Sequence, residues 1–295
     1  MTAICSNCGG AAVHSHAARD MNQKRSADLY RYARCGSCGL VFLLDVPSDL
    51  GHFYPADYYT LPSKDRMRKA AHRTSYEIGF ILRHVSSGRL TEVGPALGTF
   101  AWLARSSGFD VTGIEMDARC CEHLRDVVGV NAVNSAQPEA IFPTLPPSDA
   151  IAMWHVLEHL VDPFETLTAA AANLKSGGAL LIATPNPEAL GFRLMGSSWP
   201  HLDAPRHLHL FPLEALVERC RTLGLGLAEA SFDDPGARSW NRFSWQRLML
   251  NRVHRRPARM AALLLGGALA AATNPLDRRA HNSSAYTAVF VKDGP

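Results

Sequence analysis

Residues 88–115 constrain the fold of this chain more than any other stretch. Their sequence, GRLTEVGPALGTFAWLARSSGFDVTGIE, predicts a strand, a glycine turn, a helix and a second strand, at 90–93, 94–98, 99–107 and 111–114. A β-α-β unit of this kind builds parallel sheets flanked by helices. Its glycines let the backbone approach a ligand, and the first turn of its helix offers free N–H groups. Glu115 ends the second strand and can accept hydrogen bonds from both hydroxyls of a ribose, so the unit suits an adenosine-type ligand.

The spacing of the glycines indicates which adenosine-type ligand this is. Gly94-Pro-Ala-Leu-Gly98 does not fit the dinucleotide pattern G-x-G-x-x-G. The order E-x-G-x-x-x-G, followed by an acid at Glu115, resembles instead the class I S-adenosylmethionine-dependent methyltransferases, whose usual turn is [D/E]-x-G-x-G-x-G. Ala96 stands where that family has its middle glycine, which lets the chain pass close to the methionine part of the cofactor. A Rossmann-like unit that binds another ligand, or none, is the alternative.

Length and composition fit one large α/β domain with a small accessory unit. The chain has 295 residues, 47% of them hydrophobic and 19% charged, as in ordinary globular proteins. A net charge of +3 is too weak to argue for nucleic acid as a partner. The first residues resemble no signal peptide, and the seven cysteines then favour a reducing compartment, so we expect a cytoplasmic protein with thiols or metal rather than disulfides.

Two C-x-x-C-G knuckles near the start of the chain predict a zinc site. Cys5, Cys8, Cys35 and Cys38 supply four thiolates, a set that suits tetrahedral Zn²⁺. A glycine after each pair permits the tight turn that aims both sulfurs at one ion. Because four thiolates close the coordination shell, this zinc would be structural. His14 and His16 are a weaker metal alternative, and we expect them in a loop.

The segment after the knuckles extends the family resemblance. A short strand beginning at Gly39 is followed by Tyr54, Tyr58 and Tyr59, and this order resembles the leader of a bacterial methyltransferase subfamily whose members often act on sugars and other small metabolites. The resemblance implies that the tyrosines help to cover the cofactor pocket. Packing of the small unit on the large one is an equally good role for them. Residues 64–85 are expected to form one helix with an apolar stripe.

Further strands and helices follow in alternation, as a parallel sheet requires. We expect strands at 130–134, 148–154, 179–183, 225–230 and 286–291, and helices at 118–128, 163–174 and 212–223. The glycines after Lys175 predict a helix end. The resemblance assigns the cofactor to one set of residues: Glu92, Gly94, Gly98, Glu115, Met116, Ser135, Ala136, Trp154 and His155. Ser135 stands where the family commonly has an acid for the adenine amino group, although the N–H of Ala136 could still serve the ring.

The string His155-Val-Leu-Glu158-His159 has two interpretations. H-x-x-E-H also matches an inverted zinc-protease motif, which would have to lie within a helix. Here an apolar strand leads directly into the string, and a helix is expected only after Asp162-Pro163. The pattern of a strand followed by H-V-L-E-H-L resembles instead the methyltransferase segment that lines the methionine end of the cofactor.

Residues 199–211 form the most polar and aromatic block of the chain. They follow a strand of the predicted sheet, where α/β folds keep their substrate sites, and they resemble the family segment D-x-P-x-H-x-x-x-F. Imidazole can take up a proton near neutral pH, so His207 and His155 are the candidate bases. Asp203, Arg206 and His207 are the candidate substrate ligands, and Arg206 would orient an anionic acceptor. Individually, these histidines could equally be surface or capping groups.

Residues 238–275 look like an insert. Seven arginines and no acid occur between Arg238 and Arg259, and the uncharged stretch 260–273 that follows is too short to span a bilayer. The stretch predicts a buried helical hairpin or a dimer contact beside a solvated basic face. Peripheral attachment of residues 238–273 to an anionic membrane is the alternative.

Together these features predict a zinc-binding unit at 1–60 and a methyltransferase domain at 61–295. The fold class is α/β, a three-layer Rossmann-like fold with a mostly parallel seven-stranded sheet. The resemblance implies transfer of a methyl group from S-adenosylmethionine to a small acceptor such as a sugar or nucleotide-sugar. An RNA-modifying methyltransferase that grips phosphate with the zinc unit and the arginines is a competing interpretation, and a non-catalytic binding protein is another.

Overall fold

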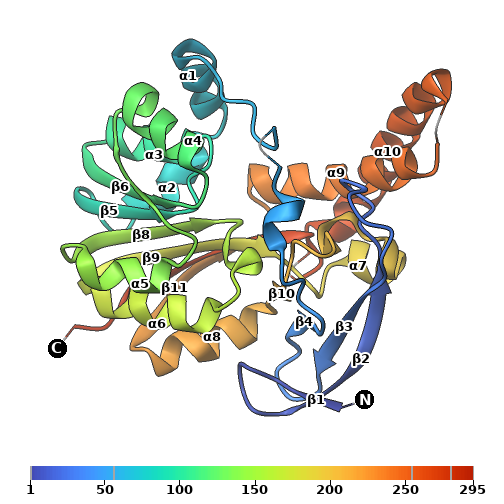
Figure 1. The fold of residues 1–295 in the computed structure, drawn as a ribbon, viewed down its shortest axis with the longest axis horizontal. Coiled ribbons are helices and arrows are strands. Elements are labelled where there is room, and N and C mark those ends of the chain that lie inside the picture. The colour runs from blue at the N-terminus through green and yellow to red at the C-terminus, as the bar shows by residue number, and fades with distance from the viewer. Residues whose placement is uncertain (1, 56, 254, 280, 295) are drawn as a thin grey trace.

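The computed structural model describes residues 2–55, 57–253, 255–279 and 281–294. A seven-stranded sheet forms the centre of the larger part of the molecule (Figure 1), in the order β11-β12-β9-β8-β5-β6-β7. All neighbouring strands from β9 to β7 are parallel, and β12 runs against both of its neighbours. The strands are β5 Gly88–Val93, β6 Phe109–Glu115, β7 Asn131–Asn134, β8 Ser148–Trp154, β9 Leu174–Pro185, β11 Leu225–Ser231 and β12 Ala285–Lys292.

Helices cover both faces of this sheet, so the predicted three-layer α/β fold is confirmed (Figure 1). Successive residues of β8 point to opposite faces: Ala150 and Ala152 join one apolar cluster, and Ile151 and Met153 join the other. The first cluster packs against α2 and α3, and the second against α6 and α8. The helices of these layers are α1 Lys64–Arg73, α2 Tyr76–Leu82, α3 Thr99–Ser106, α4 Ala118–His123, α5 Pro138–Ile141, α6 Pro163–Asn173 and α8 Leu213–Thr222.

A second, antiparallel sheet contains the N-terminal residues. Its order is β1-β2-β3-β4-β10, with β1 Thr2–Ile4, β2 Ala11–Ala18, β3 Tyr30–Cys35, β4 Val41–Leu43 and β10 His209–Leu210. Since β10 comes from the polar block, this sheet is completed by a strand remote in sequence. Leu40 and Phe42 also pack with Phe211 and Leu213, so a shared apolar core holds the two sheets together.

Several local expectations are wrong. The helix expected at 64–85 is two helices, because the chain turns at Thr74 and Ser75 between α1 and α2. His14 and His16 lie on β2 rather than in a loop. The helix expected at 163–174 is found at Pro163–Asn173, but the glycines after Lys175 lie within β9, which begins at Leu174 and pairs irregularly with β8 at this point.

The insert is a helical hairpin. It consists of α9 Pro235–Asn251 and α10 Arg256–Asp277, which pack against each other. In Figure 1 the end of α10 reaches away from the body of the molecule at the upper right. Helix α9 also contacts β12 and the short turn of residues 200–202, so one side of it belongs to the core of the protein. The remaining helix, α7 Leu190–Met195, lies beside α9.

Candidate active site

The glycine turn between β5 and α3 cannot carry side chains at its two glycines. Gly94 and Gly98 have left-handed φ values of 64° and 76°. A Cβ at Gly94 would lie 2.6 Å from Val156 Cγ2, and one at Gly98 would lie 2.7 Å from Val128 Cγ2. Ala96 is also left-handed, with φ 48°, a conformation that costs a non-glycine residue on the order of 1 kcal/mol. The turn therefore keeps the conformation of a glycine-rich loop in spite of the alanine.

Glu115 is held by the turn that it faces. Its Oε2 accepts a hydrogen bond from the Ala96 N–H at 2.9 Å, and its Oε1 accepts one from the Asp117 N–H at 2.9 Å. Burial raises the pKa of Glu115, and these two N–H groups oppose that change. Each carboxylate oxygen has capacity for a second hydrogen bond, so two ribose hydroxyls could still be accepted. The donor and acceptor set thus fits the adenosine part of the predicted cofactor.

Glu92 lies on β5, two residues before Gly94, and is 2% exposed. Its Oε2 has no hydrogen-bond partner among the described residues. Burial, strengthened by the charges of Glu77 and Glu115, raises the pKa of Glu92 well above its usual range. Whether Glu92 contacts the cofactor stays a prediction.

The other predicted cofactor residues lie at the ends of β6, β7 and β8. Met116 is 50% exposed, and the Ser135 N–H donates to the Glu115 carbonyl at 2.9 Å. The Asn134 side chain, which the sequence analysis did not single out, donates to the carbonyls of Glu115 and Met116, both at 2.9 Å. It ties β7 to the end of β6. Trp154 packs on Phe100 with its indole N–H unpartnered in the described chain.

Three tyrosines lie between this region and the polar block. Tyr59 is next to the end of β6: burial raises its pKa, and the carboxylate of Glu115 raises it further. Tyr58 stands edge-on to Tyr59 with a ring-centre distance of 4.8 Å. Tyr54 stands edge-on to Tyr58 at 5.3 Å and shares a 2.9 Å hydrogen bond between its hydroxyl and His159 Nδ1. The tyrosines therefore form a continuous wall across the carboxyl ends of the strands.

The polar block borders a cavity of about 290 Å³, called here the His207 cavity. Its lining comes from the N-terminal unit, the polar block and α9: Asn22, Gln23, Tyr58, Pro200, His201, Asp203, Arg206, His207, Trp240, Phe243 and Arg247. Three regions of the chain that are far apart in sequence thus build one cavity, with aromatic walls and a few charged groups, as is usual for small-molecule sites.

His207 is fixed in one orientation. Its Nδ1 lies 2.8 Å from the carbonyl of His201, so Nδ1 carries the proton and donates it to that oxygen. Nε2 is then the basic nitrogen, 3.9 Å from Asp203 Oδ2. Burial would raise the pKa of Asp203, but the charges of His207 and Arg206 lower it to about 2. In its neutral form His207 is therefore a held imidazole whose Nε2 lone pair is free beside a carboxylate, as a general base needs.

His155 joins the end of β8 to α9. It has φ 52°, left-handed for a residue with a side chain, and its ring stacks on Trp240 with a centre distance of 4.0 Å. Its Nδ1 lies 3.6 Å from Oε1 of the fully buried Glu158. The backbone N–H of His155 donates to the Ala183 carbonyl at 2.8 Å. This histidine connects the strand ends to the wall of the His207 cavity.

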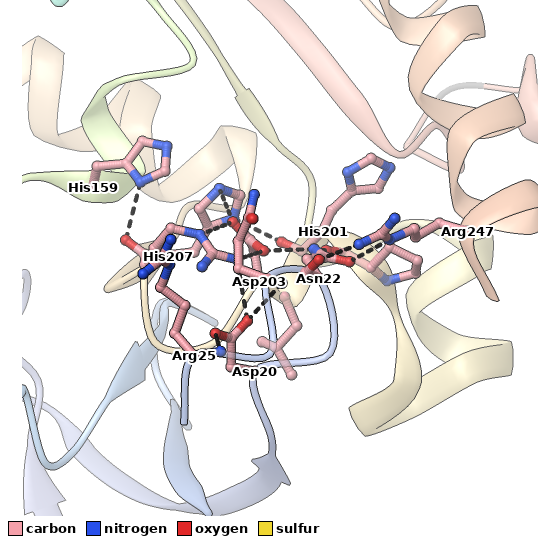
Figure 2. A network of polar contacts seen from close by, with 12 residues as sticks. Asp20, Asn22, Arg25, His159, His201, Asp203, His207 and Arg247 are labelled. Atoms are coloured by element: carbon pink, nitrogen blue, oxygen red, sulfur yellow. Dashed lines mark hydrogen bonds and ion pairs between the residues drawn. The ribbon is translucent and has the colours of Figure 1, made fainter. Parts of the chain in front are cut away.

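Arg206 is buried, and carboxylates already hold most of its guanidinium. Nε donates to Asp203 Oδ2 at 2.9 Å, and Nη2 donates to Asp203 Oδ1 and lies 3.4 Å from Asp20 Oδ1. Only Nη1 has no partner among the described residues. Figure 2 shows Asp20 and Asn22 beside Asp203, and Arg247 bonded to Asn22. The expected role of Arg206 in orienting an anion stays a prediction, and Arg247, half-buried in the cavity wall, is a second candidate.

The protease interpretation of H-x-x-E-H does not fit. Residues Leu157–His159 form one short turn of 3-10 helix, and His155 lies before it in a left-handed conformation. His155 and His159 are therefore not on one face of a helix, as that zinc motif requires.

The four knuckle cysteines come together at the edge of the small sheet. All four sulfurs lie within 4.8 Å of one another, with Cys5 and Cys38 at 3.7 Å and Cys8 and Cys35 at 3.5 Å. A tetrahedral Zn²⁺ with bonds of about 2.3 Å places its sulfurs roughly 3.8 Å apart. The arrangement fits one zinc ion.

Comparison with known proteins identifies the family. The sequence model of a methyltransferase domain matches residues 64–230, more than half of the chain. The chain belongs to this methyltransferase family. The match begins at α1 and ends in β11, and so includes the glycine turn, Glu115 and the polar block. S-adenosylmethionine is the cofactor of the class I enzymes that share this domain, and the residues of the turn fit it.

Individual proteins that resemble this chain are also methyltransferases. The ubiquinone biosynthesis O-methyltransferase of Saccharophagus degradans is 28% identical over 157 residues, which make up 49% of this chain and 66% of that protein, just under two thirds of its length. A methyltransferase structure from Archaeoglobus fulgidus superposes with a TM-score of 0.52 and 17% identity, over 78% of this chain and 97% of that one. The phosphoethanolamine N-methyltransferase 2 of Haemonchus contortus superposes with a TM-score of 0.53 and 14% sequence identity, over 100% of this chain and 71% of that one. At such identities the structures show the shared fold alone.

Proposed function

We propose that this methyltransferase transfers a methyl group from S-adenosylmethionine to a hydroxyl of a small molecule bound in the His207 cavity. The observation that carries the proposal is the position of His207, whose Nε2 is free at the wall of a cavity of about 290 Å³. That volume suits a small acceptor. The similarity to a ubiquinone biosynthesis O-methyltransferase supports a small acceptor and an oxygen nucleophile.

Different residues of the chain would bind the cofactor, accept the proton and align the acceptor. The cofactor supplies an electrophilic methyl group when it is bound at Glu115 and the glycine turn. His207 would accept the proton of the acceptor hydroxyl at Nε2 and stay oriented by the His201 carbonyl. His155 is the rival base. The tyrosine wall and Trp240 would exclude water and align the acceptor, which contributes much of the rate in a displacement of this kind.

The acceptor class follows from the cavity wall. Trp240, Phe243 and Tyr58 offer ring surfaces, and Arg247 offers a positive charge. A sugar or other ring that carries a hydroxyl and an anionic group, such as a nucleotide-sugar, fits this combination.

We further propose that the four cysteines hold a structural zinc. We also propose that the zinc-binding unit is 1–60, that the methyltransferase domain is 61–295, and that the protein works in the cytoplasm.

The test uses methyl-labelled S-adenosylmethionine and a panel of nucleotide-sugars, sugar phosphates and hydroxylated aromatic compounds. We expect label to pass to one of these classes, and Trp240→Ala to reduce that transfer while the affinity for S-adenosylhomocysteine stays unchanged. Label that passes only to RNA or protein would contradict the acceptor class. Acceptor turnover that is unchanged in Trp240→Ala would contradict the location of the site.

A further inference from the structure

One whole side of α10, called here the α10 face, is apolar and exposed. Its largest members are Met260, Leu264, Leu265 and Leu276, whose exposed fractions are 64%, 70%, 53% and 42%. At 100° per residue these side chains fall within one half of the helix surface, together with the exposed residues Ala261, Ala268, Ala271, Ala272 and Pro275. No charged side chain interrupts this face between Met260 and Leu276. An apolar face of this length on the outside of a protein marks a contact surface.

The flanks of this face are strongly basic. Between Arg238 and Arg259 the hairpin has seven arginines and no acid, which exceeds the net charge of +3 of the whole chain. The rest of the protein is therefore net negative, and positive charge is concentrated here. Four of these arginines are exposed and have no carboxylate partner among the described residues: Arg242, Arg252, Arg255 and Arg259.

The hairpin has the dimensions of a surface contact rather than of a membrane span. By length and composition alone Ala258–Asp277 could cross a bilayer. Its uncharged stretch 260–276 measures only about 25 Å as a helix, against about 30 Å for the hydrocarbon core. Asp277 is buried and accepts a 2.8 Å hydrogen bond from Thr273 Oγ1, which in turn accepts one from Trp245 Nε1 at 3.0 Å. These bonds hold α10 against α9.

We propose that the α9–α10 hairpin docks on an anionic membrane surface, with the α10 face in the interfacial region and the arginines at lipid phosphates. Apolar area on one side with unpaired arginines at its edge is the combination that binds such a surface. A second copy of the chain is the poorer occupant, because a symmetric contact through this face would bring two arginine clusters together. Helix α9 also carries Trp240 and Arg247, so docking would bring the His207 cavity close to the bilayer.

The experiment is co-sedimentation of the full-length protein with vesicles. We expect binding to vesicles of phosphatidylcholine with phosphatidylglycerol, little binding to phosphatidylcholine alone, and loss of binding as salt is raised. Arg255→Gln with Arg259→Gln should weaken binding roughly fivefold for each arginine removed. Leu264→Glu with Leu265→Glu should weaken it at least tenfold. Because vesicle binding requires no methyl transfer, this proposal and the proposed activity fail separately.

Matched controls are available elsewhere on the surface. Arg89→Gln with Arg221→Gln removes two exposed arginines outside the hairpin, and Leu194→Glu changes a leucine that is 61% exposed on α7. Both should bind vesicles like the parent protein, and thermal melts should show that all variants are folded. Equal binding to neutral and anionic vesicles would overturn the proposal. So would vesicle binding that the hairpin variants leave unchanged, or a dimer in sedimentation velocity that Leu264→Glu dissociates without any binding to vesicles.

Discussion

Asp20 and Arg206 lie 3.4 Å apart and join the N-terminal unit to the wall of the His207 cavity. Both side chains are almost completely buried, and the same guanidinium is held by Asp203 from its own loop. Nearby, Arg247 donates to the Asn22 side chain at 3.2 Å, so α9 is tied to the same N-terminal loop. The small unit is therefore part of the cavity.

Replacement of Arg206 tests whether its main role is structural. Arg206→Met leaves Asp20 and Asp203 buried without their partner, which should lower the free energy of unfolding by about 3–5 kcal/mol in urea titrations. Arg221→Met, which removes an exposed pair with Glu218, should leave it unchanged. If Arg206→Met is as stable as the parent and only raises KM for the acceptor, the role in orienting an anion is the correct one.

Removal of a knuckle cysteine tests the metal site. The parent protein should contain about one zinc per chain by elemental analysis, and Cys38→Ser should contain almost none, because three thiolates no longer close the site. The melting temperature should fall with the zinc. Cys220→Ala is the control, since Cys220 is buried on α8 outside the cluster. A metal-free parent that melts at the same temperature would refute the site.

Glu115 tests the cofactor site. If Glu115 accepts hydrogen bonds from the ribose hydroxyls, Glu115→Ala should cost about 1.5–3 kcal/mol of binding free energy, or roughly 10- to 150-fold in Kd for S-adenosylhomocysteine. Calorimetry should show this loss, and Glu122→Ala on the exposed side of α4 should show none. Unchanged affinity in Glu115→Ala would place the ribose elsewhere.

Once an acceptor is known, paired single-turnover assays can distinguish which of His207 and His155 is the base. His207→Ala should lower the rate by about 10²–10⁴-fold and leave cofactor affinity nearly unchanged. His155→Ala should also weaken cofactor binding, because His155 follows Trp154 at the end of β8. His72→Ala on α1 serves as the surface control. A near-parent rate in His207→Ala would assign the base to His155 or show that alignment alone suffices.

Buried histidines predict acid sensitivity. Burial lowers the pKa of His209 to about 4, with a hydrogen bond to the Leu160 carbonyl opposing it. The unfolded chain, with a pKa near 6.5, binds the proton more readily, so this contribution to stability is complete above pH 6.5 and is lost as the pH falls toward 4. His209→Phe should remove about 3 kcal/mol of this pH-dependent stability. Urea titrations between pH 7 and 4.5 should show a flatter profile in the variant, and an identical profile would contradict the assignment.

The large sheet was predictable because its signals are local. One short stretch contains residues 90–93, Gly94, Gly98 and Glu115. The strands and helices predicted on either side of it alternate, as a parallel sheet requires. Of the small sheet, only the strand that follows Gly39 was predicted, and it is β4. The other strands were missed because glycines, arginines and histidines interrupt their alternation, and because the last strand, β10, comes from far along the chain. The four cysteines of the two knuckles come together as expected, because each C-x-x-C-G pair already brings two sulfurs close to each other.

The cavity could not be assembled from the sequence. Asp20 lies 186 residues before Arg206 in the sequence, and Asn22 lies 225 residues before Arg247. No periodicity or spacing relates His155 to Trp240, although their rings stack in the structure. Arg206 illustrates the difficulty best: beside three histidines it resembled a ligand for an anion, yet two carboxylates of the protein already surround it.

The wall that Trp240, Phe243 and Arg247 give to the His207 cavity belongs entirely to α9, an insertion between the last two strands of the sheet. The glycine turn and Glu115 lie in another part of the chain, so under the proposed function different segments would bind most of the acceptor and most of the cofactor. Exchange of the hairpin between β11 and β12 would then be a direct way to alter acceptor choice. A shortened chain without residues 235–277 would be a poor choice for acceptor screening, because it would lack one side of the pocket in which the acceptor is expected to bind.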